Sequence, residues 1–503
     1  MKMGSGLLAV LAALPVLAAA EAVNIGGRRE LFVDNAVIGR TSGELRLVLH
    51  RPQPRETVFK TDKPWEGNTS AYQSVFKADG KYRMYYRGWD FPDYKGEPAR
   101  AGVLCYAEST DGIHWVRPNL GICEFQKSKE NNIILDQAAV QSARGDLAHT
   151  FVFYDTNPAC PDDQRYKAVI VGWGGLHIWG SGDGLHFRAL GNKPCVTDGA
   201  FDSQNLIFWD SVAKTYRAYY RIFRDKKVRD ILTAASGDIL KFPPGKRVSR
   251  SQGQEIELYT NQMQPYYRAP HIILGFPMRY HDRGKNALAW PAMQALPGLE
   301  NRKIRYSASP RYGTVVTDAV LLASRDGESV RLWEEAFMRP GPRMKESWVY
   351  GDNFIFWGML ELPAVLEDAP NELSFYSTES YCEGEATKFR RSTLRLDGFV
   401  SAQATAAGGE LVTKPLIFEG NALSINFETG GPGELKAELQ QPDGTPIPGF
   451  ALADCFPIFG DHIGFPVSWK GKGTDVSALE GKAVCIRFTL KDADLYAFQF
   501  TGQ

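Results

Sequence analysis

Two stretches of the chain repeat one pattern, an apolar strand, a polar turn and an aromatic-basic strand: SVFKADGKYRMYYR at residues 74–87 and LIFWDSVAKTYRAYYR at residues 206–221. Weaker copies run through residues 151–170, 267–273 and 354–357. An internal repeat of strand pairs, with no sustained helical periodicity between the copies, is typical of sheets arranged radially as the blades of a β-propeller. The repeat therefore predicts an all-β fold with five blades, and six blades stay open as the alternative because the copies diverge.

A second motif follows most copies: a strand that ends in Ser-x-Asp, usually followed by Gly and then by an aromatic residue. It occurs at residues 109–115, 181–187, 236–242 and 324–333. Asp and Gly tolerate the positive φ that tight turns between antiparallel strands require. We interpret these segments as hairpin turns of the scaffold.

The composition changes to Ala, Thr and Gly at residues 402–409, which indicates a linker. Short alternating strands follow, so residues 410–503 are expected to form a β-sandwich. The propeller would then occupy residues 23–401. We expect its last blade to be closed by a strand from near the chain start, such as residues 30–33.

The first 22 residues have the features of a secretory signal. Lys2 precedes an apolar run from Leu7 to Leu17, and the small residues 18–20 follow it. The run is too short to span a bilayer as a helix. The sequence therefore predicts a secreted or periplasmic protein that is not embedded in a membrane.

Charge and cysteine content narrow the function classes. Lys+Arg and Asp+Glu both total 58, so the chain lacks the basic field that nucleic-acid binding exploits. The 7 cysteines include no C-x-x-C pair, so neither a zinc site nor a dense disulfide framework is indicated. Cys455 and Cys485 are one candidate pair, and small buried apolar residues are the alternative reading. We predict no metal and no cofactor.

An acidic residue stands just ahead of each of the five repeats. Blades of a propeller present the starts of their innermost strands to a central funnel, so such residues converge in space. Glycoside hydrolysis needs two carboxyl groups, one protonated and one ionised. The candidate catalytic residues are Asp202, Glu66, Glu257, Asp146 and Glu346. Asp202 is the strongest of them, because polar residues follow it and a clearly buried strand comes next; the alternative for each acid is a cap on backbone amides.

Other side chains near the repeats have the chemistry to hold a sugar. Trp65 and Tyr72 offer aromatic surfaces, whereas His149 and His271 either position substrate or satisfy buried carbonyls. Arg268 either holds a substrate carboxylate or bridges two blades.

With these repeats and acids in view, the chain resembles the five-bladed proteins of glycoside hydrolase families 32 and 43. It is most similar to bacterial family-32 N-terminal-like proteins, in which a sandwich follows the propeller. The fructosidase motifs W-x-N-D-P-N-G, R-D-P and E-C are absent, so catalytic residues are not transferred by motif. Asp34, in the segment FVDN at residues 32–35, is the nearest match to the N-terminal aspartate of those families.

The leading hypothesis is a glycoside hydrolase that cleaves a polysaccharide or oligosaccharide by carboxylate acid/base chemistry in the funnel. The competing hypothesis is a noncatalytic carbohydrate-binding propeller. A sialidase-like protein is third, because the Ser-x-Asp-Gly turns resemble an Asp box, and it would need an arginine triad in the funnel. The expected partner in all three cases is a carbohydrate, and the sequence does not specify an oligomeric state.

Overall fold

The computed structural model describes residues 22–91, 100–225, 227–250, 256–285 and 289–502. Most elements are β-strands, which confirms the all-β prediction. The expected signal at residues 1–22 lies outside the described residues except for Ala22. Among the described residues, no helix is both long and apolar enough to cross a membrane. The chain divides into unit one, residues 1–46 with 402–503, and unit two, residues 47–401.

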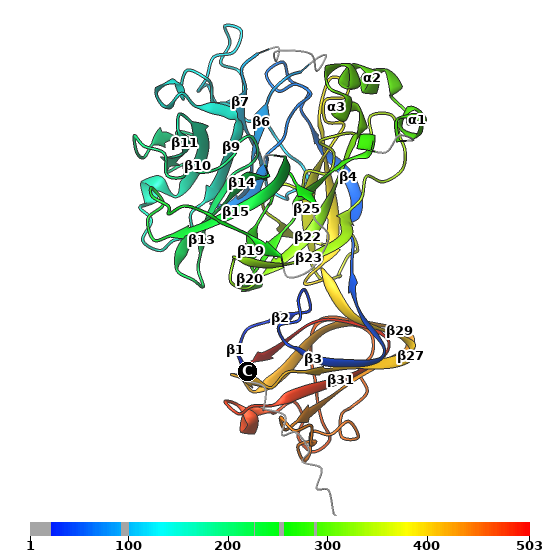
Figure 1. The fold of residues 1–503 in the computed structure, drawn as a ribbon. Helices are drawn as coiled ribbons and strands as arrows, with labels where there is room; N and C mark the ends of the chain where they lie inside the picture. Colours follow the sequence, from blue (N-terminus) through cyan, green and yellow to red (C-terminus); the bar gives the residue numbers. More distant parts are fainter. Residues whose placement is uncertain (1–21, 92–99, 226, 251–255, 286–288, 503) are drawn as a thin grey trace, which may run out of the picture. The chain divides into compact units, whose positions relative to one another are not determined.

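Unit two contains five sheets that follow one another along the described chain (Figure 1). The first consists of β5 (Ser74–Ala78), β6 (Lys81–Gly88), β7 (Val103–Ser109) and β8 (Ile133–Leu135). The second consists of β9 (Asp146–Tyr154), β10 (Tyr166–Gly172), β11 (Gly175–Ser181) and β12 (Arg188–Ala189). The third consists of β13 (Leu206–Asp210), β14 (Thr215–Arg224), β15 (Val228–Ser236) and β16 (Lys246–Arg247). Both strongly repeated stretches therefore lie in antiparallel strand pairs, β5 with β6 and β13 with β14.

The fourth sheet is the largest and is interrupted by a helical insertion. Its strands are β17 (Ser249–Arg250), β18 (Glu257–Leu258), β19 (Gln264–Tyr266), β20 (Ala269–Gly275), β21 (Met278–Asp282), β22 (Val315–Ser324) and β23 (Ser329–Met338). The helices α1 (Ala289–Gln294), α2 (Leu299–Ala308) and α3 (Pro310–Thr314) lie between β21 and β22. Short 3₁₀ helices elsewhere in the chain are η1 (Gln141–Ala143), η2 (Asp162–Gln164), η3 (Arg283–Lys285) and η4 (Ser477–Leu479).

The fifth sheet is completed by a strand from the start of unit two. It contains β24 (Leu360–Leu362), β25 (Glu372–Glu379) and β26 (Lys388–Arg395), and β4 (Gln53–Lys60) pairs antiparallel with β26 (Figure 1). Residues 30–33, expected to close the last blade, are not part of this sheet, because β2 (Glu30–Leu31) pairs with β31 (Cys485–Thr501) of unit one. The last sheet is therefore completed by a strand from near the chain start, as expected, but this strand is β4 and not residues 30–33. Phe59 on β4 lies opposite Phe389 of β26 in this pairing, and the two rings stack at 5.5 Å between centroids, a contact that stabilises the strand pair.

In the Ser-x-Asp-Gly turns, the Ser and Asp side chains accept hydrogen bonds from backbone N–H groups of the same segment. Ser109 Oγ accepts the Gly112 N–H at 2.9 Å, and Asp111 Oδ1 accepts the His114 N–H at 2.8 Å. Gly112 has a φ of +76°, the left-handed conformation in which a Cβ is disfavoured. The copy at residues 181–186 forms the same bonds.

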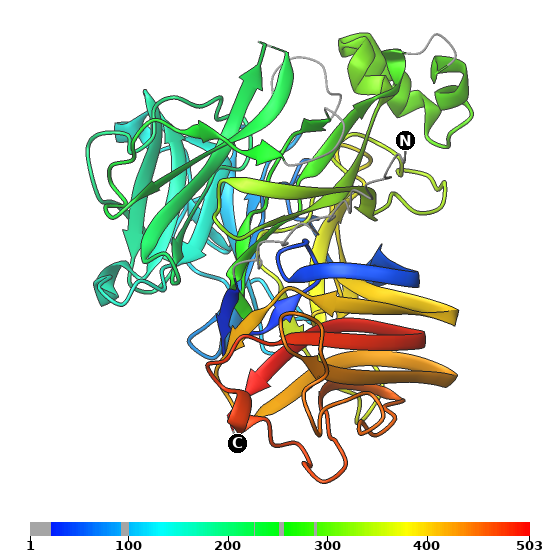
Figure 2. The ribbon, with the colours of Figure 1, turned by 60° about the horizontal axis from the view of Figure 1, so that its bottom comes forward.

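Unit one is built from both ends of the chain. Its main sheet has the order β3 (Ile38–Leu49), β27 (Val400–Thr413), β31 (Cys485–Thr501), β29 (Ala422–Gln440) and β30 (Asp461–Pro466), and Figure 2 shows the first four side by side. β1 (Val23–Gly26) pairs in parallel with β28 (Leu416–Phe418). The expected linker, residues 402–409, lies inside β27 instead, because its alternate residues Ala402 and Ala404 are buried while its backbone pairs with β31. Residues 23–46, assigned to the propeller from the sequence, belong to this unit.

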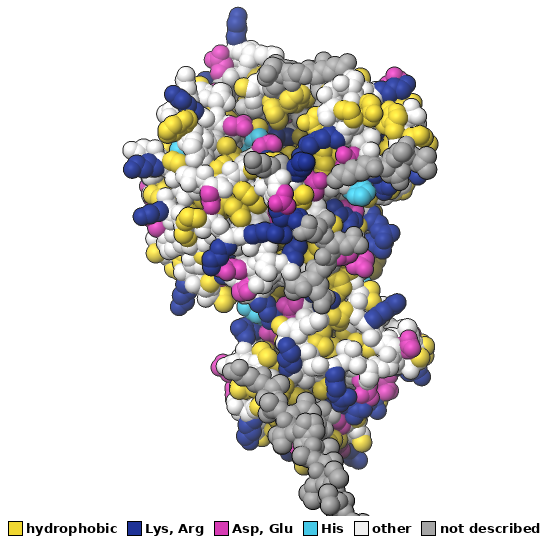
Figure 3. Space-filling view, in the orientation of Figure 1, with side chains coloured by type: hydrophobic (Ala, Val, Ile, Leu, Met, Phe, Trp, Pro, Cys, Tyr) yellow, Lys and Arg dark blue, Asp and Glu magenta, His cyan; other side chains and the backbone are white. Residues whose placement is uncertain are grey.

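All seven cysteines are free buried thiols, including Cys455 and Cys485, so the candidate disulfide is absent. On the face of unit two seen in Figure 3, acidic and basic side chains are interspersed, which agrees with the balanced composition.

Candidate active site

Side chains from the starts of all five sheets of unit two meet in one place. We call Tyr72, His149, Asp202, Tyr259 and Phe354 the sheet-start cluster. The ring of Tyr72 lies 5.4 Å from that of His149 and 5.6 Å from that of Phe354. Its hydroxyl donates to the Tyr259 hydroxyl at 3.3 Å, and His149 Nε2 lies 3.0 Å from Asp202 Oδ1. Residues separated by up to 282 positions in the numbering thus form a single cluster.

His149 links two carboxylates. Its Nδ1 atom lies 2.8 Å from Asp146 Oδ2 and its Nε2 atom 3.0 Å from Asp202 Oδ1. Asp146 Oδ1 also accepts the Ala148 N–H at 2.7 Å, which holds the carboxylate at the start of β9. With an acceptor at each ring nitrogen, the imidazole is best matched by its doubly protonated form.

The electrostatics agree with a protonated imidazole between ionised acids. Burial opposes the charged ring, but the hydrogen bonds to Asp146 and Asp202 outweigh it and raise the pKa of His149. Burial likewise opposes ionisation of Asp202, yet His149 and Arg221 lower the pKa of that carboxyl well below its usual range. The Asp202 side chain is nevertheless 71% exposed, so an ionised oxygen is presented to solvent.

Arg221 forms an ion pair with Asp202. Its Nη2 atom donates to Asp202 Oδ2 at 3.0 Å and its Nε atom to the Ala200 carbonyl at 3.0 Å. The guanidinium also lies 5.5 Å from the ring centroid of Tyr259, within range of a cation–π contact. Arg221 is the last residue of the second strong repeat, and its counterpart in the first, Arg87, lies 4.9 Å from the Tyr72 ring.

Tyr72 is held rigidly. Its φ is +61°, a strained value for a non-glycine residue, and such strain persists only where the surroundings fix it. Burial, with smaller contributions from Tyr259 and Tyr381, raises the pKa of Tyr72 well above its usual value. Its phenol therefore remains a neutral hydrogen-bonding group.

Glu257 adjoins the cluster through an arginine. Arg229 Nη1 donates to Glu257 Oε2 at 2.9 Å, and the guanidinium lies 5.2 Å from the Tyr259 ring and 4.3 Å from that of Tyr280. Glu257 is therefore charge-paired and partly buried at the start of the fourth sheet.

Asp352 is a carboxyl group that the sequence analysis missed. It lies two residues before Phe354 and is buried, and its Oδ1 atom accepts the Tyr381 N–H at 3.1 Å. Burial, aided by Glu379 and Glu383, raises the pKa of Asp352 well above its usual value. Its only signal in the sequence is its place ahead of the weak repeat at residues 354–357.

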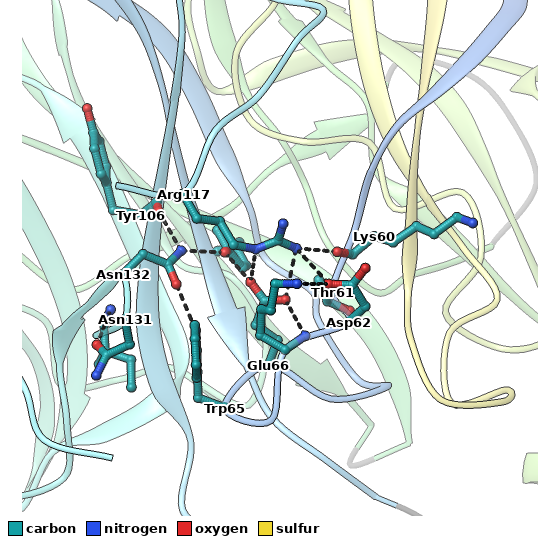
Figure 4. Close-up of polar contacts among 12 residues, drawn as sticks. Lys60, Thr61, Asp62, Trp65, Glu66, Tyr106, Arg117, Asn131 and Asn132 are labelled. Carbon is teal, nitrogen blue, oxygen red and sulfur yellow. Dashed lines mark hydrogen bonds and ion pairs between the residues drawn. The ribbon is translucent and has the colours of Figure 1, made fainter. Parts of the chain in front are cut away.

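Glu66 lies in a buried polar network outside the cluster (Figure 4). Arg117 donates to it through Nε at 2.7 Å and Nη2 at 3.0 Å, and the Tyr86 hydroxyl and Lys63 N–H also donate to it. Trp65 is engaged nearby, with its indole N–H on Asn132 Oδ1 at 2.7 Å. Glu66 has no exposed surface, so its surroundings are those of a structural ion pair.

The remaining sequence candidates lie elsewhere. Glu346, in the loop after β23, pairs with Lys388 at 3.0 Å. Arg268, in the turn between β19 and β20, bonds Asp397 through Nε at 2.9 Å and Nη2 at 3.3 Å. His271 is buried within β20, and Asp34 belongs to unit one, where it accepts the Ala36 N–H at 2.9 Å. The structure thus brings Asp146, His149, Asp202 and Tyr72 together, with Glu257 beside them.

Among the described residues, no group of three or more His, Cys, Asp or Glu side chains is placed to hold a metal ion. Arg87 lies over the ring of Tyr72, and Arg221 and Arg229 lie over that of Tyr259. The sequence analysis did not predict these contacts.

No family model matches the chain, and no curated protein matches it. Solved structures similar to it include a thermostable family-43 glycoside hydrolase, with 11% identity, 67% of this chain and 93% of the other covered, and a TM-score of 0.37. A glycosyl hydrolase from Bacteroides ovatus has 16% identity over 68% and 93% of the two chains, with a TM-score of 0.40. An N-acetylgalactosamine deacetylase from F. plautii has 12% identity over 70% and 96%, also with a TM-score of 0.40. At such values the function has to be argued from the site itself.

Proposed function

We propose that this protein is a secreted glycoside hydrolase whose catalytic centre is the sheet-start cluster, with Asp202 as its ionised carboxylate. The observation that carries the proposal is the state of Asp202. It is an exposed carboxylate, kept ionised by two cations, at a point where the starts of five sheets converge.

We further propose that the five sheets are the blades of a propeller and that unit one is a β-sandwich. The order of the sheets along the chain, the closing strand β4 and the meeting of the sheet starts all support five blades. This architecture would place the cluster at the mouth of the central funnel, where substrates of such folds bind.

The chemistry needs a second carboxyl group that carries a proton. Asp352 has the required opposite environment, because burial keeps it neutral whereas Asp202 is held ionised. Pairs of acids whose surroundings drive their pKa values apart supply the acid and the base of glycosidases. Asp352 would protonate the leaving oxygen, and Asp202 would act as base or nucleophile.

The other cluster residues have supporting roles in this scheme. His149 orients Asp202 and, as a cation, keeps it ionised. Tyr72 and Tyr259 are only 6% exposed and hydrogen-bond one another, so in this scheme they hold the site in shape and do not stack on the sugar.

A noncatalytic sugar-binding protein is the second candidate, since Asp202 is neutralised by the same two cations that keep it ionised. The two candidates differ in turnover.

In the test, the purified protein is incubated with a panel of polysaccharides and released reducing ends are measured. Asp202→Asn is expected to lower kcat about 10² to 10⁴-fold while binding persists.

Asp162→Asn is the matched control, because Asp162 is an exposed aspartate whose Oδ1 pairs with Arg165 at 3.2 Å, outside the cluster. Binding of a glycan with no released ends from any member of the panel would favour the noncatalytic protein. Wild-type turnover in Asp202→Asn would remove Asp202 from the mechanism.

A further inference from the structure

Unit two contains a second feature, which shares with the proposed chemistry only the side chain of Asp352. A cavity of about 970 Å³ lies between β4, β26 and the loop that follows β23. Its volume is at the upper end of the range for small-molecule sites, enough for several sugar units. We call it the basic cavity.

Seven cationic side chains line the basic cavity against three carboxyl groups, Glu346, Asp352 and Glu379. Two of the carboxylates are already neutralised, Glu346 by Lys388 and Glu379 by Arg390. Arg55 is 3.8 Å from Glu372, which is not part of the lining. The other four cations form no ion pair with a described residue: Arg51, Lys60, Arg339 and Lys345. The cavity therefore has a surplus of positive charge and several uncommitted donors.

Its floor holds further unused donors. Ser377, Ser380 and Ser392 line the cavity and are only 3%, 4% and 4% exposed. Their hydroxyl groups have no hydrogen-bond partner among the residues that the structure describes. None of the three hydroxyls is among the fully buried polar atoms that lack a partner, so each keeps some contact with solvent and is open to a hydrogen bond from a ligand.

We propose that the basic cavity binds an acidic oligosaccharide, a sugar chain that carries carboxylate or sulfate groups. The anionic character follows from the four unpaired cations, because arginine and lysine bind carboxylates and sulfates through charge-assisted hydrogen bonds. The serine hydroxyls and the apolar side chains Met338 and Met344 match the hydroxyls and ring faces of sugars. That the ligand is a sugar rests on the proposed function; that it is anionic does not.

Calorimetric titration of the intact protein tests the charge requirement. The probes are hexagalacturonate, its fully methyl-esterified form, and a heparin-derived hexasaccharide. We expect binding of at least one charged probe, at least about tenfold tighter than the ester and weakened by salt. Preference for galacturonate would identify carboxylate as the recognised anion, and preference for the heparin fragment would identify sulfate. Equal affinity for the ester and the acid, or no binding of either charged probe, would overturn the proposal.

Variants locate the binding. Arg339→Ala with Lys345→Ala removes two exposed cations from the lining and is expected to weaken binding of the charged probe about tenfold or more. Arg343→Ala is the matched control, because Arg343 is exposed in the same loop but does not line the cavity. An equal loss in both variants would show that the site lies elsewhere.

Asp202→Asn separates this proposal from the proposed function. The variant should still bind the charged probe in the cavity even where turnover is lost. If no glycan on the panel is hydrolysed but the cavity still prefers the acidic probe, the proposed function fails and the binding site stands.

Discussion

The Nε2 atom of His149, on the second sheet, lies 3.0 Å from the Oδ1 atom of Asp202, which precedes the third sheet. This contact ties two neighbouring sheets together at their starts. Asp146 contacts the other nitrogen of the same ring, so a change in the charge of the imidazole alters the electrostatic environment of both carboxylates.

The stability that His149 provides should depend on pH. The pKa of His149 is raised above 6.5 in the folded protein, so its contribution is fully present below pH 6.5 and is lost as the pH rises through the folded value. We expect His149→Gln to destabilise the protein more at pH 6 than at pH 9. Urea unfolding of both proteins at the two pH values measures this. An equal difference at both would show that the imidazole is not charged.

Replacing Asp352 should stabilise the protein at neutral pH. Its folded pKa is raised above 3.8, so the unfolded chain releases the proton first and stability falls as the pH rises past that value. Asp352→Asn keeps the acceptor for the Tyr381 N–H and removes the titration. We expect the variant to be more stable than the wild type at pH 7, with the gain disappearing near pH 3.8. If Asp352 is also the general acid, kcat should fall in the same variant.

Removing Arg117 should expose the cost of the buried Glu66 carboxylate. Arg117→Met leaves that charge without its bidentate partner, and losing one member of a buried pair costs about 3–5 kcal/mol. Chemical denaturation measures the loss. The double variant with Glu66→Gln should recover part of it, and turnover per folded molecule should remain. Lost turnover in a folded Glu66→Gln protein would return Glu66 to the catalytic candidates.

Phe59 tests the closing strand. It is buried on β4, stacks on Phe389 and lies 5.3 Å from Tyr86, so Phe59→Ala should lower the free energy of unfolding by about 3–5 kcal/mol. Gln53→Ala, at an exposed position of the same strand, should change it by about 0.5 kcal/mol or less. Similar effects of both changes would mean that β4 contributes little to the fifth sheet.

The sequence predicts the repeated strands well because both pattern and turn chemistry are local. The stretch ending at Arg87 and the one ending at Arg221 each fold into the expected strand pair, and Asp202 stands at a sheet start as its position implies. Both repeats end in an arginine, Arg87 and Arg221, and this is apparent from the sequence. That each arginine contacts a tyrosine ring of the cluster depends on packing between sheets, which the sequence does not show.

What the sequence could not reveal depends on long-range pairing. Strand β4 is half exposed and lacks the strong apolar pattern of an inner strand, so nothing local marks it as the partner of β26. Residues 402–409 look like a linker because small side chains suffice where a long strand packs against its neighbours. Asp352 could not be recognised for a similar reason, since the backbone N–H that it accepts belongs to Tyr381, 29 positions later in the chain.

The pairing within unit one gives the chain a nested organisation. Arg46 Nη2 lies 3.3 Å from Gln403 Oε1, so the two points at which the chain leaves and re-enters unit one are close together. Unit two is thus an insertion between two adjoining strands of a host fold. Each strand of the host that precedes the insert pairs with one that follows it, so the host sheet can form only after the whole insert has been synthesised.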